Sequence, residues 1–170
     1  MSDTFEHDDR RLEIRSIRPD DRDAWLELMR SMSWATRFKR GARRVEQLSA
    51  DDIDRAVDPD PRSELAFVAM DRNEGTPKMA GVARATLRGP ATWEFSLLVL
   101  DAWQRRGIGR RLMQALIETV EARGGQSVEG EVLSSNLNML DFVRSLGFVV
   151  EPSANQKLVR RVVLRLASSR

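Results

Sequence analysis

The 170-residue sequence has no cysteine and no tyrosine, and its one histidine is His7. The lack of cysteine excludes disulfides, thiolate metal sites and a cysteine nucleophile, and it fits a reducing compartment. With a single histidine, a histidine metal cluster or a catalytic histidine is not expected. No apolar run approaches the ~20 residues of a membrane helix, and residues 1–11 contain no apolar signal segment. The sequence therefore predicts a cytoplasmic protein that binds neither a metal nor a membrane.

An excess of charge of one sign is also missing. The 28 basic and 26 acidic residues leave a net charge of +2, and only three of the basic residues are lysines. One short stretch, Arg37–Arg44, is basic and contains an aromatic residue. We expect a solvated loop or a surface that recognises a substrate or partner there, and nucleic-acid binding is the least favoured alternative.

The pattern of apolar residues predicts a mixed α/β (α+β) domain whose first half is mostly antiparallel. The expected strands cover residues 12–17, 65–70, 79–87, 93–100, 127–133, 148–150 and 158–166. The first expected helix begins after a cap at Asp20 or Asp21 and has Trp25, Leu28, Met29 and Met32 at helical spacing. The other expected helices cover residues 46–57, 107–122 and 136–146. Residues 1–10 are predicted to be a disordered tail, and residues 11–170 a single domain.

Residues 98–111 combine the end of an apolar strand, a short loop with glycines and the start of an amphipathic helix. Glycines let the backbone approach a ligand closely, and the first N–H groups of a helix bind anions. Four arginines and no acidic residue lie from Gln104 to Arg111. Gly109 is followed by arginines rather than the Lys-Ser/Thr of a P-loop, and Leu112 replaces the third small residue of a dinucleotide fingerprint. The pattern favours a phosphate or pyrophosphate ligand, and the alternative is a basic helix start without a ligand.

The segment Gln104-Arg105-Arg106-Gly107-Ile108-Gly109 resembles the acyl-CoA loop, Gln/Arg-x-x-Gly-x-Gly/Ala, of the GNAT N-acetyltransferase superfamily. Downstream, Asn136-Leu137-Asn138-Met139 and Leu146-Gly147-Phe148 resemble that superfamily's asparagine-initiated helix ending in Gly-Phe. Trp93–Val99, Gly130–Leu133 and Arg37-Phe38 are similar to the acetyltransferase domain of bacterial Pat-type protein lysine acetyltransferases. The resemblance implies a GNAT fold, with a mixed, mostly antiparallel central sheet flanked by helices, and an acetyl-CoA-dependent N-acetyltransferase.

The resemblance also implies roles in binding acetyl-CoA. The backbone groups that would pair with the pantetheine arm are those of Leu98, Val99 and Leu100. The N–H groups that would hold the pyrophosphate belong to Arg105, Arg106, Gly107, Ile108, Gly109 and Arg110. Gln104 would cap this loop, and Asn136 would contact the arm near its sulfur. The arm would lie between the strand ending near Leu100 and the strand 127–133, which splay apart in this fold.

Transfer to an amine needs a neutral nucleophile, and deprotonating a lysine of pKa ~10.4 at pH 7 costs about 4.6 kcal/mol. A general base in the acceptor site is therefore expected. Glu94 is the leading candidate, because burial in its otherwise apolar strand would suit it to take a proton, and the Pat-type resemblance places the catalytic glutamate there. Glu131 is the runner-up and shares a strand face with Glu129. For both residues the alternative is a solvent-facing glutamate.

Many GNAT enzymes protonate the leaving thiolate with a tyrosine, and the corresponding position here is Val143. Water, Ser134, Ser135 or Ser145 remain as proton sources. Without cysteine, direct transfer in a ternary complex is expected. The leading acceptor is a protein lysine. The alternatives are a small amine such as a polyamine, amino acid or antibiotic, and a non-catalytic CoA-binding regulatory module. The sequence leaves the acceptor, the acyl-chain length, the oligomeric state and the regulation open.

Overall fold

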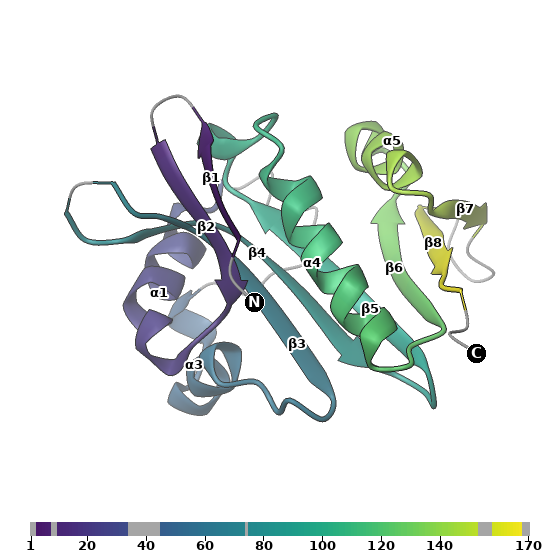
Figure 1. The fold of residues 1–170 in the computed structure, drawn as a ribbon, viewed down its shortest axis with the longest axis horizontal. Coiled ribbons are helices and arrows are strands. Elements are labelled where there is room, and N and C mark those ends of the chain that lie inside the picture. Colours follow the sequence, from purple (N-terminus) through teal and green to yellow (C-terminus); the bar gives the residue numbers. More distant parts are fainter. Residues whose placement is uncertain (1–2, 8–9, 34–44, 74, 153–157, 168–170) are drawn as a thin grey trace. The chain divides into compact units, whose positions relative to one another are not determined.

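The computed structural model describes residues 3–7, 10–33, 45–73, 75–152 and 158–167 (Figure 1). The strands are β1 (Asp3–His7), β2 (Arg10–Ser16), β3 (Glu64–Asp71), β4 (Lys78–Leu87), β5 (Thr92–Val99), β6 (Ser127–Leu133), β7 (Val149–Pro152) and β8 (Val159–Arg165). The α-helices are α1 (Arg22–Ser31), α3 (Ala50–Val57), α4 (Ile108–Ala122) and α5 (Leu137–Ser145). The 3-10 turns are η1 (Pro19–Asp21), η2 (Val45–Gln47) and η3 (Asp101–Trp103). From β2 onward, the order of strands and helices confirms the order predicted from the sequence.

The chain divides into two compact units, residues 1–84 with 97–116 and residues 85–96 with 117–170. Strands β4 and β5 and helix α4 contribute residues to both. The single domain that the sequence predicts over residues 11–170 stays a prediction. Antiparallel pairs outnumber the one parallel pair, β5 with β6, among the pairings described for the chain. The fold is thus of the predicted class, α/β with a mixed, mostly antiparallel sheet and helices.

In the first unit, neighbouring strands follow the order β1-β2-β3-β4. The segment predicted to be a disordered tail contains β1, which pairs antiparallel with β2 so that Phe5 lies opposite Leu12. The polar sequence gave no apolar signal for this strand. Backbone pairing along a sheet edge needs no apolar side chains, since the hydrogen bonds come from the main chain.

The core of the first unit lies between this sheet and the helices α1 and α3. Strand β3 is buried along nearly its whole length, which explains its uninterrupted apolar run. Trp25 and Leu28 of α1 and Val57 of α3 pack into this core. The expected cap of α1 is only partly correct. The turn η1 precedes the helix, and the Asp21 carboxylate accepts the Arg18 N–H at 2.8 Å without capping α1 itself.

In the second unit, neighbouring strands follow the order β5-β6-β8-β7. Asn136 begins α5 as predicted, because its Oδ1 accepts the Met139 N–H at 3.4 Å. Gly147, with φ of +91°, follows the helix in a conformation that favours glycine. Phe148 then packs against Phe95, with ring centroids 5.3 Å apart. The asparagine and the glycine therefore fix both ends of α5.

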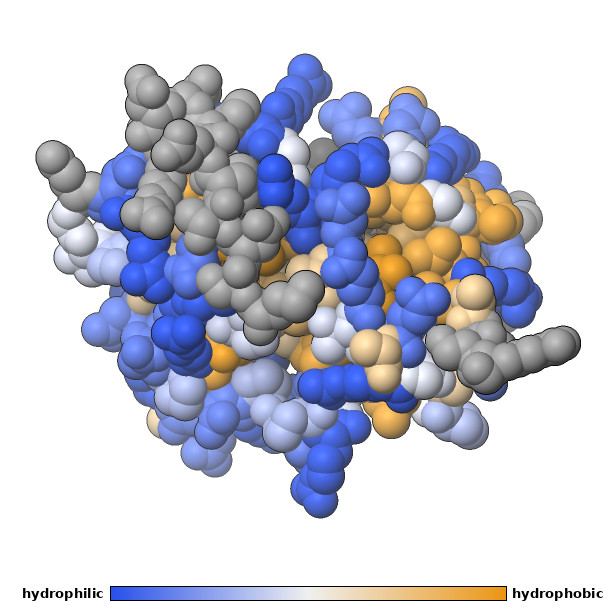
Figure 2. Space-filling view, viewed as in Figure 1, coloured by the Kyte–Doolittle hydropathy of each residue, from blue (hydrophilic) through white to orange (hydrophobic). Residues whose placement is uncertain are grey.

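Apolar side chains also reach the surface of the second unit. Figure 2 shows orange, hydrophobic surface over the region that Figure 1 labels α5 and β7. The most exposed large apolar residues are Leu137, Val149 and Leu158. Across the described ranges, no helix combines the length and hydropathy needed to cross a membrane.

Candidate active site

The segment predicted to bind acetyl-CoA lies in the first unit, at the end of β5. The Leu100 N–H donates to the Ala80 carbonyl at 3.0 Å, which ties this end of β5 to β4. The Val99 carbonyl accepts the Gln104 Nε2 at 3.1 Å. Two of the backbone groups expected to meet the pantetheine arm thus already have partners within the protein.

Gln104 holds the turn that follows β5. Its Nε2 also donates to Asp101 Oδ1 at 3.1 Å, so one side chain joins the strand end to η3. Arg105 and Gly107 have φ of 59° and 75°, which reverse the backbone just before α4. For a residue with a side chain this left-handed conformation costs roughly 1–2 kcal/mol, so Arg105 is a strained position. The Arg106 guanidinium lies 5.6 Å from the centre of the buried Trp103 ring.

Helix α4 begins directly after this turn. Its first described hydrogen bond runs from the Arg111 N–H to the Gly107 carbonyl at 3.1 Å. The first N–H groups of an α-helix find no acceptor within the helix, and the helix dipole is positive at this end of α4. The loop therefore has the backbone arrangement that binds phosphate groups.

The helix expected to contact the CoA arm lies in the second unit. The Asn136 side chain caps α5 through its Oδ1. Val143, which the resemblance placed at the position of the family's tyrosine, is fully buried. The Ser145 Oγ donates to the Phe142 carbonyl at 2.6 Å, so its proton is already engaged. Ser145 is therefore a poor source of a proton for a thiolate.

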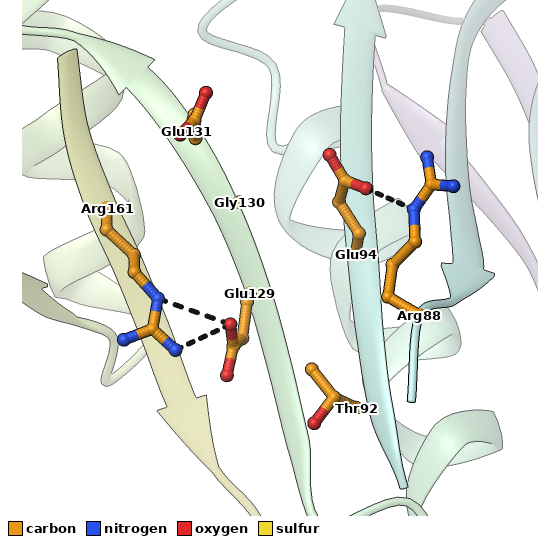
Figure 3. A pocket seen from close by; sticks show the side chains of 7 residues that line it. All are labelled: Arg88, Thr92, Glu94, Glu129, Gly130, Glu131 and Arg161. Carbon is orange, nitrogen blue, oxygen red and sulfur yellow. Dashed lines mark hydrogen bonds and ion pairs between the residues drawn. The ribbon is translucent and has the colours of Figure 1, made fainter. Parts of the chain in front are cut away.

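A surface pocket of about 190 Å³ lies in the second unit (Figure 3). Its lining residues are Arg88, Thr92, Glu94, Glu129, Gly130, Glu131 and Arg161. The structure thus places the leading candidate base, the runner-up and Glu129 in one pocket. The sequence gave no reason to place Arg88 in the site, and it favoured a solvated face for Arg160-Arg161, whereas the structure places Arg88 and Arg161 in the pocket lining. Their pairing with carboxylates on neighbouring strands could have been predicted only once the strand register was known.

The expected burial of Glu94 is wrong. Strand β5 alternates, with Trp93 and Phe95 buried on one face and Glu94 exposed on the other. The Glu94 side chain is 47% exposed, and its carboxylate accepts the Arg88 Nε at 2.5 Å. The apolar neighbours face the core of the unit, so they do not desolvate a residue between them.

Strands β5 and β6 pair in parallel from Thr92–Ser127 to Glu94–Glu129, and the described pairing ends there although both strands continue. Beyond this point the Phe95 ring lies against Gly130. A Cβ added at Gly130 would lie 2.7 Å from Phe95 Cε1, so a side chain at this position would displace the ring. Gly130 therefore leaves room for the Phe95 ring where the described pairing ends and the pocket opens.

The three carboxylates of the pocket have different partners. Glu129 accepts hydrogen bonds from Arg161 Nη2 at 2.7 Å and from Ser127 Oγ at 3.2 Å. The hydrogen bond to Glu129 raises the pKa of Arg161 above its ordinary value, so the guanidinium stays charged. Glu94 is paired with Arg88. Glu131 is exposed, and no hydrogen bond or ion pair joins it to the described residues. One carboxylate is thus left to meet a ligand.

Two sequence features fall elsewhere. Arg37–Arg44 lies outside the described residues, as does Trp34. Trp25, Trp93 and Trp103 are buried, as expected for core residues. Within the described ranges no group of three or more histidine, cysteine or acidic side chains is placed to hold a metal ion.

The first unit thus holds a glycine-containing turn suited to an anion, and the second unit a pocket whose net negative charge suits a cation. The model of the acetyltransferase (GNAT) family matches residues 25–148. The chain belongs to this family. It is an acetyl-CoA-dependent N-acetyltransferase, and its membership favours the enzyme over a non-catalytic binding module.

Two relatives show how far the sequence likeness extends. Acetyltransferase PA5475 of Pseudomonas aeruginosa is 27% identical over 160 residues, which cover 92% of this chain and 86% of that protein. A [ribosomal protein bS18]-alanine N-acetyltransferase of Salmonella typhimurium is 37% identical over 67 residues, or 39% of this chain and 41% of that protein.

Solved structures support the fold. The GNAT domain of S. lividans PAT is similar with a TM-score of 0.83 and 20% identity, over 97% of each chain. The yncA protein of Salmonella typhimurium, solved with its cofactor acetyl-CoA, has a TM-score of 0.70 and 20% identity, over 92% of this chain and 94% of that one.

Proposed function

We propose that the protein transfers an acetyl group from acetyl-CoA to the side-chain amine of a lysine in another protein, directly and without an acetyl-enzyme intermediate. The observation that carries this proposal is the charge of the pocket. Its lining holds three glutamates and two arginines, which leaves one uncompensated negative charge. Such a pocket attracts a cation, and an amine acceptor arrives as an ammonium. A cytoplasmic location, expected from the lack of a membrane helix and of an apolar signal segment, is part of the proposal.

The size of the pocket favours the end of a side chain over an enclosed metabolite. Sites that enclose small molecules usually measure about 300–1,000 Å³. The pocket measures about 190 Å³ and is partly open to solvent. A lysine offers a compact ammonium on a flexible stem, which can enter such a pocket while the rest of the substrate protein stays outside.

The loop after β5 is proposed to bind the donor. The N–H groups from Arg105 to Arg110 would hold the pyrophosphate, with Gln104 fixing the turn through its bonds to Val99 and Asp101. Leu98–Leu100 and Asn136 would contact the pantetheine arm. These contacts follow from the family resemblance, and the positive end of α4 supplies the physical reason for an anion there.

Glu94 is proposed to take the proton from the acceptor ammonium. In its ion pair with Arg88, both side chains are about half exposed or more. Such exposed pairs contribute only about 0–1 kcal/mol to stability, so separating Glu94 from Arg88 costs little free energy. The neutral amine then attacks the acetyl carbonyl carbon, the C–S bond breaks and the CoA sulfur becomes a thiolate. As the amide forms, the nitrogen loses its second proton, and in this proposal a water molecule passes a proton on to the thiolate, so that CoA leaves as the thiol. Glu131 is the alternative base.

A relative supports a protein acceptor. The Salmonella enzyme acts, by its name, on an alanine of a ribosomal protein, so the matched segment occurs in an enzyme that acetylates protein amines. A small-molecule amine is the competing acceptor, and the experiment below separates the two.

The test is to incubate the protein with acetyl-labelled acetyl-CoA and a bacterial lysate, either dialysed or not, and to follow the label. We expect label in discrete protein bands with dialysed lysate, in lysine side chains by mass spectrometry. Label that appears only in the small-molecule fraction, and only with undialysed lysate, would refute the protein acceptor and support a metabolite amine.

A further inference from the structure

Arg161 stands between carboxylates of two neighbouring strands. In the strand register it lies opposite Glu131 of β6 and Glu151 of β7. Its guanidinium does not pair with Glu131. Instead Nη2 and Nε donate to Glu129 Oε2 at 2.7 and 3.3 Å, and Nη1 donates to Glu151 Oε2 at 3.1 Å (Figure 3 shows the contacts with Glu129). The arginine thus reaches diagonally across the sheet to the more buried carboxylate.

This choice of partner divides the carboxylates of the pocket into two kinds. Glu129 has Arg161 on one oxygen and the Ser127 hydroxyl on the other, so it is held in place and its charge is compensated. Glu131, two residues along the same strand face, keeps an exposed carboxylate. If the guanidinium were absent, Glu129 and Glu131 would both offer negative charge to a ligand in the pocket. Glu151 would also lose its partner, but it is not among the residues that line the pocket.

We infer that Arg161 is a positioning residue that sets the acceptor specificity of the pocket. By holding and neutralising Glu129, it leaves the pocket with one free negative charge. This charge suits an acceptor with one ammonium group and disfavours a diamine. The inference rests on the proposed function, since it concerns the acceptor of that reaction. Its physical basis is charge matching, because a second ammonium gains attraction only where a second carboxylate is uncompensated.

The test compares two acceptors that differ in one charge. One is a lysine blocked at its amino and carboxyl groups, and the other is 1,5-diaminopentane, which has a similar carbon chain and two ammonium groups. We expect Arg161→Gln to raise the ratio of kcat/KM for the diamine to that for the blocked lysine about three- to fivefold, mainly through a lower KM for the diamine. Arg161→Lys keeps the charge and should stay within about twofold of the unchanged protein.

Two further variants show whether the effect acts through Glu129. Adding Glu129→Gln to Arg161→Gln removes the freed charge and should return the ratio to its starting value. Arg144→Gln removes another exposed, ion-paired arginine of the same unit, and should leave the ratio unchanged. An unchanged ratio in Arg161→Gln, or an equal change in Arg144→Gln, would overturn the inference.

Titration of the diamine without acetyl-CoA, followed by NMR, separates failure of this inference from failure of the proposed function. If no amine is acetylated but Arg161→Gln still tightens diamine binding, the charge-setting role stands and the proposed reaction fails. If acetylation proceeds but neither the ratio nor the binding changes, the proposed reaction stands and the role of Arg161 is refuted.

Discussion

The two units each contain an arginine–carboxylate cluster with nearly the same contact distance and very different surroundings. In the first unit, Arg15 donates to both oxygens of Asp21 at 2.6 and 2.7 Å, and the two side chains are only 7% and 6% exposed. In the second unit, Arg161 donates to Glu129 at 2.7 Å, with side chains 47% and 22% exposed. The distances alone do not distinguish the two clusters.

Burial gives the clusters different roles. Removing one partner of a buried pair leaves a charge in a medium that cannot solvate it, which costs several kcal/mol. An exposed pair is screened by water and contributes about 1 kcal/mol or less. The pair in the first unit therefore serves stability. The pairs in the pocket can exchange partners with a substrate at little cost.

The largest effect on stability is expected for Asp21→Asn. This change replaces the carboxylate that accepts two hydrogen bonds from buried Arg15 by a neutral amide, and leaves Glu13, 3.8 Å from Nε, as the carboxylate beside the guanidinium. The free energy of unfolding should fall by about 3 kcal/mol. Urea unfolding, followed by circular dichroism at pH 7, measures it. The exposed ion pair of Asp60 with Arg62 gives a matched control, and Asp60→Asn should leave the unfolding midpoint unchanged. A similar midpoint for both variants would contradict the role of burial.

The same pair predicts a pH dependence. Burial alone raises the pKa of Asp21, but the hydrogen bonds from Arg15 and from the Arg18 N–H outweigh it, so the pKa lies below its ordinary value. The stabilisation is therefore fully present above the unfolded pKa of about 3.9 and is lost as the pH falls through the folded pKa. The stability difference between the unchanged protein and Asp21→Asn should shrink toward acid pH. A difference that grows on acidification would contradict this sign.

A smaller effect, on activity alone, is expected for Glu131→Gln. Loss of the free carboxylate should raise KM for a lysine peptide about tenfold, or ~1.4 kcal/mol, with little change in stability. Steady-state kinetics at saturating acetyl-CoA measure it. Glu118→Gln, on the exposed face of α4, removes a carboxylate of the same unit outside the pocket and should leave KM unchanged. An unchanged KM in Glu131→Gln would show that this carboxylate does not meet the acceptor.

The smallest expected effect on stability is that of Arg161→Gln, and it tests the comparison of the two clusters most closely. Arg161→Gln breaks a pair as short as that of Asp21, yet the free energy of unfolding should change by no more than about 1 kcal/mol, since the pair is exposed. Chemical unfolding of this variant beside Asp21→Asn tests it. A loss of stability equal to that of Asp21→Asn would mean that contact distance, rather than burial, governs these pairs.

The sequence predicted best what local physics determines. Asn136 and Gly147 mark the ends of α5 because a cap and a positive φ select those residue types. The bounds of β6, at Ser127 and Leu133, could be predicted because buried and more exposed residues alternate along the second half of the strand. The alternation of β5 could also have been read, since Trp93 and Phe95 flank Glu94, and it argues against the burial expected for Glu94.

Contacts that depend on the strand register could not be predicted from the sequence. Arg161 is 32 residues from Glu129, and only the β6–β8 register brings them together. Strand β1 has no apolar pattern, because its partner is the backbone of β2. The buried pair of Arg15 and Asp21 looks, in the sequence, like a strand arginine and a helix cap. In each case the deciding contact is made by residues that carry no local signal.

The central claim is that the pocket carries out the chemistry, with Glu94 as its base. The most direct measurement is kcat for acetylation of a lysine peptide by Glu94→Gln, together with its Kd for acetyl-CoA and its unfolding midpoint. We predict that kcat falls about 100-fold or more while Kd and the midpoint stay unchanged, because the amide cannot accept the proton and the side chain is exposed. A kcat equal to that of the unchanged protein would contradict the claim.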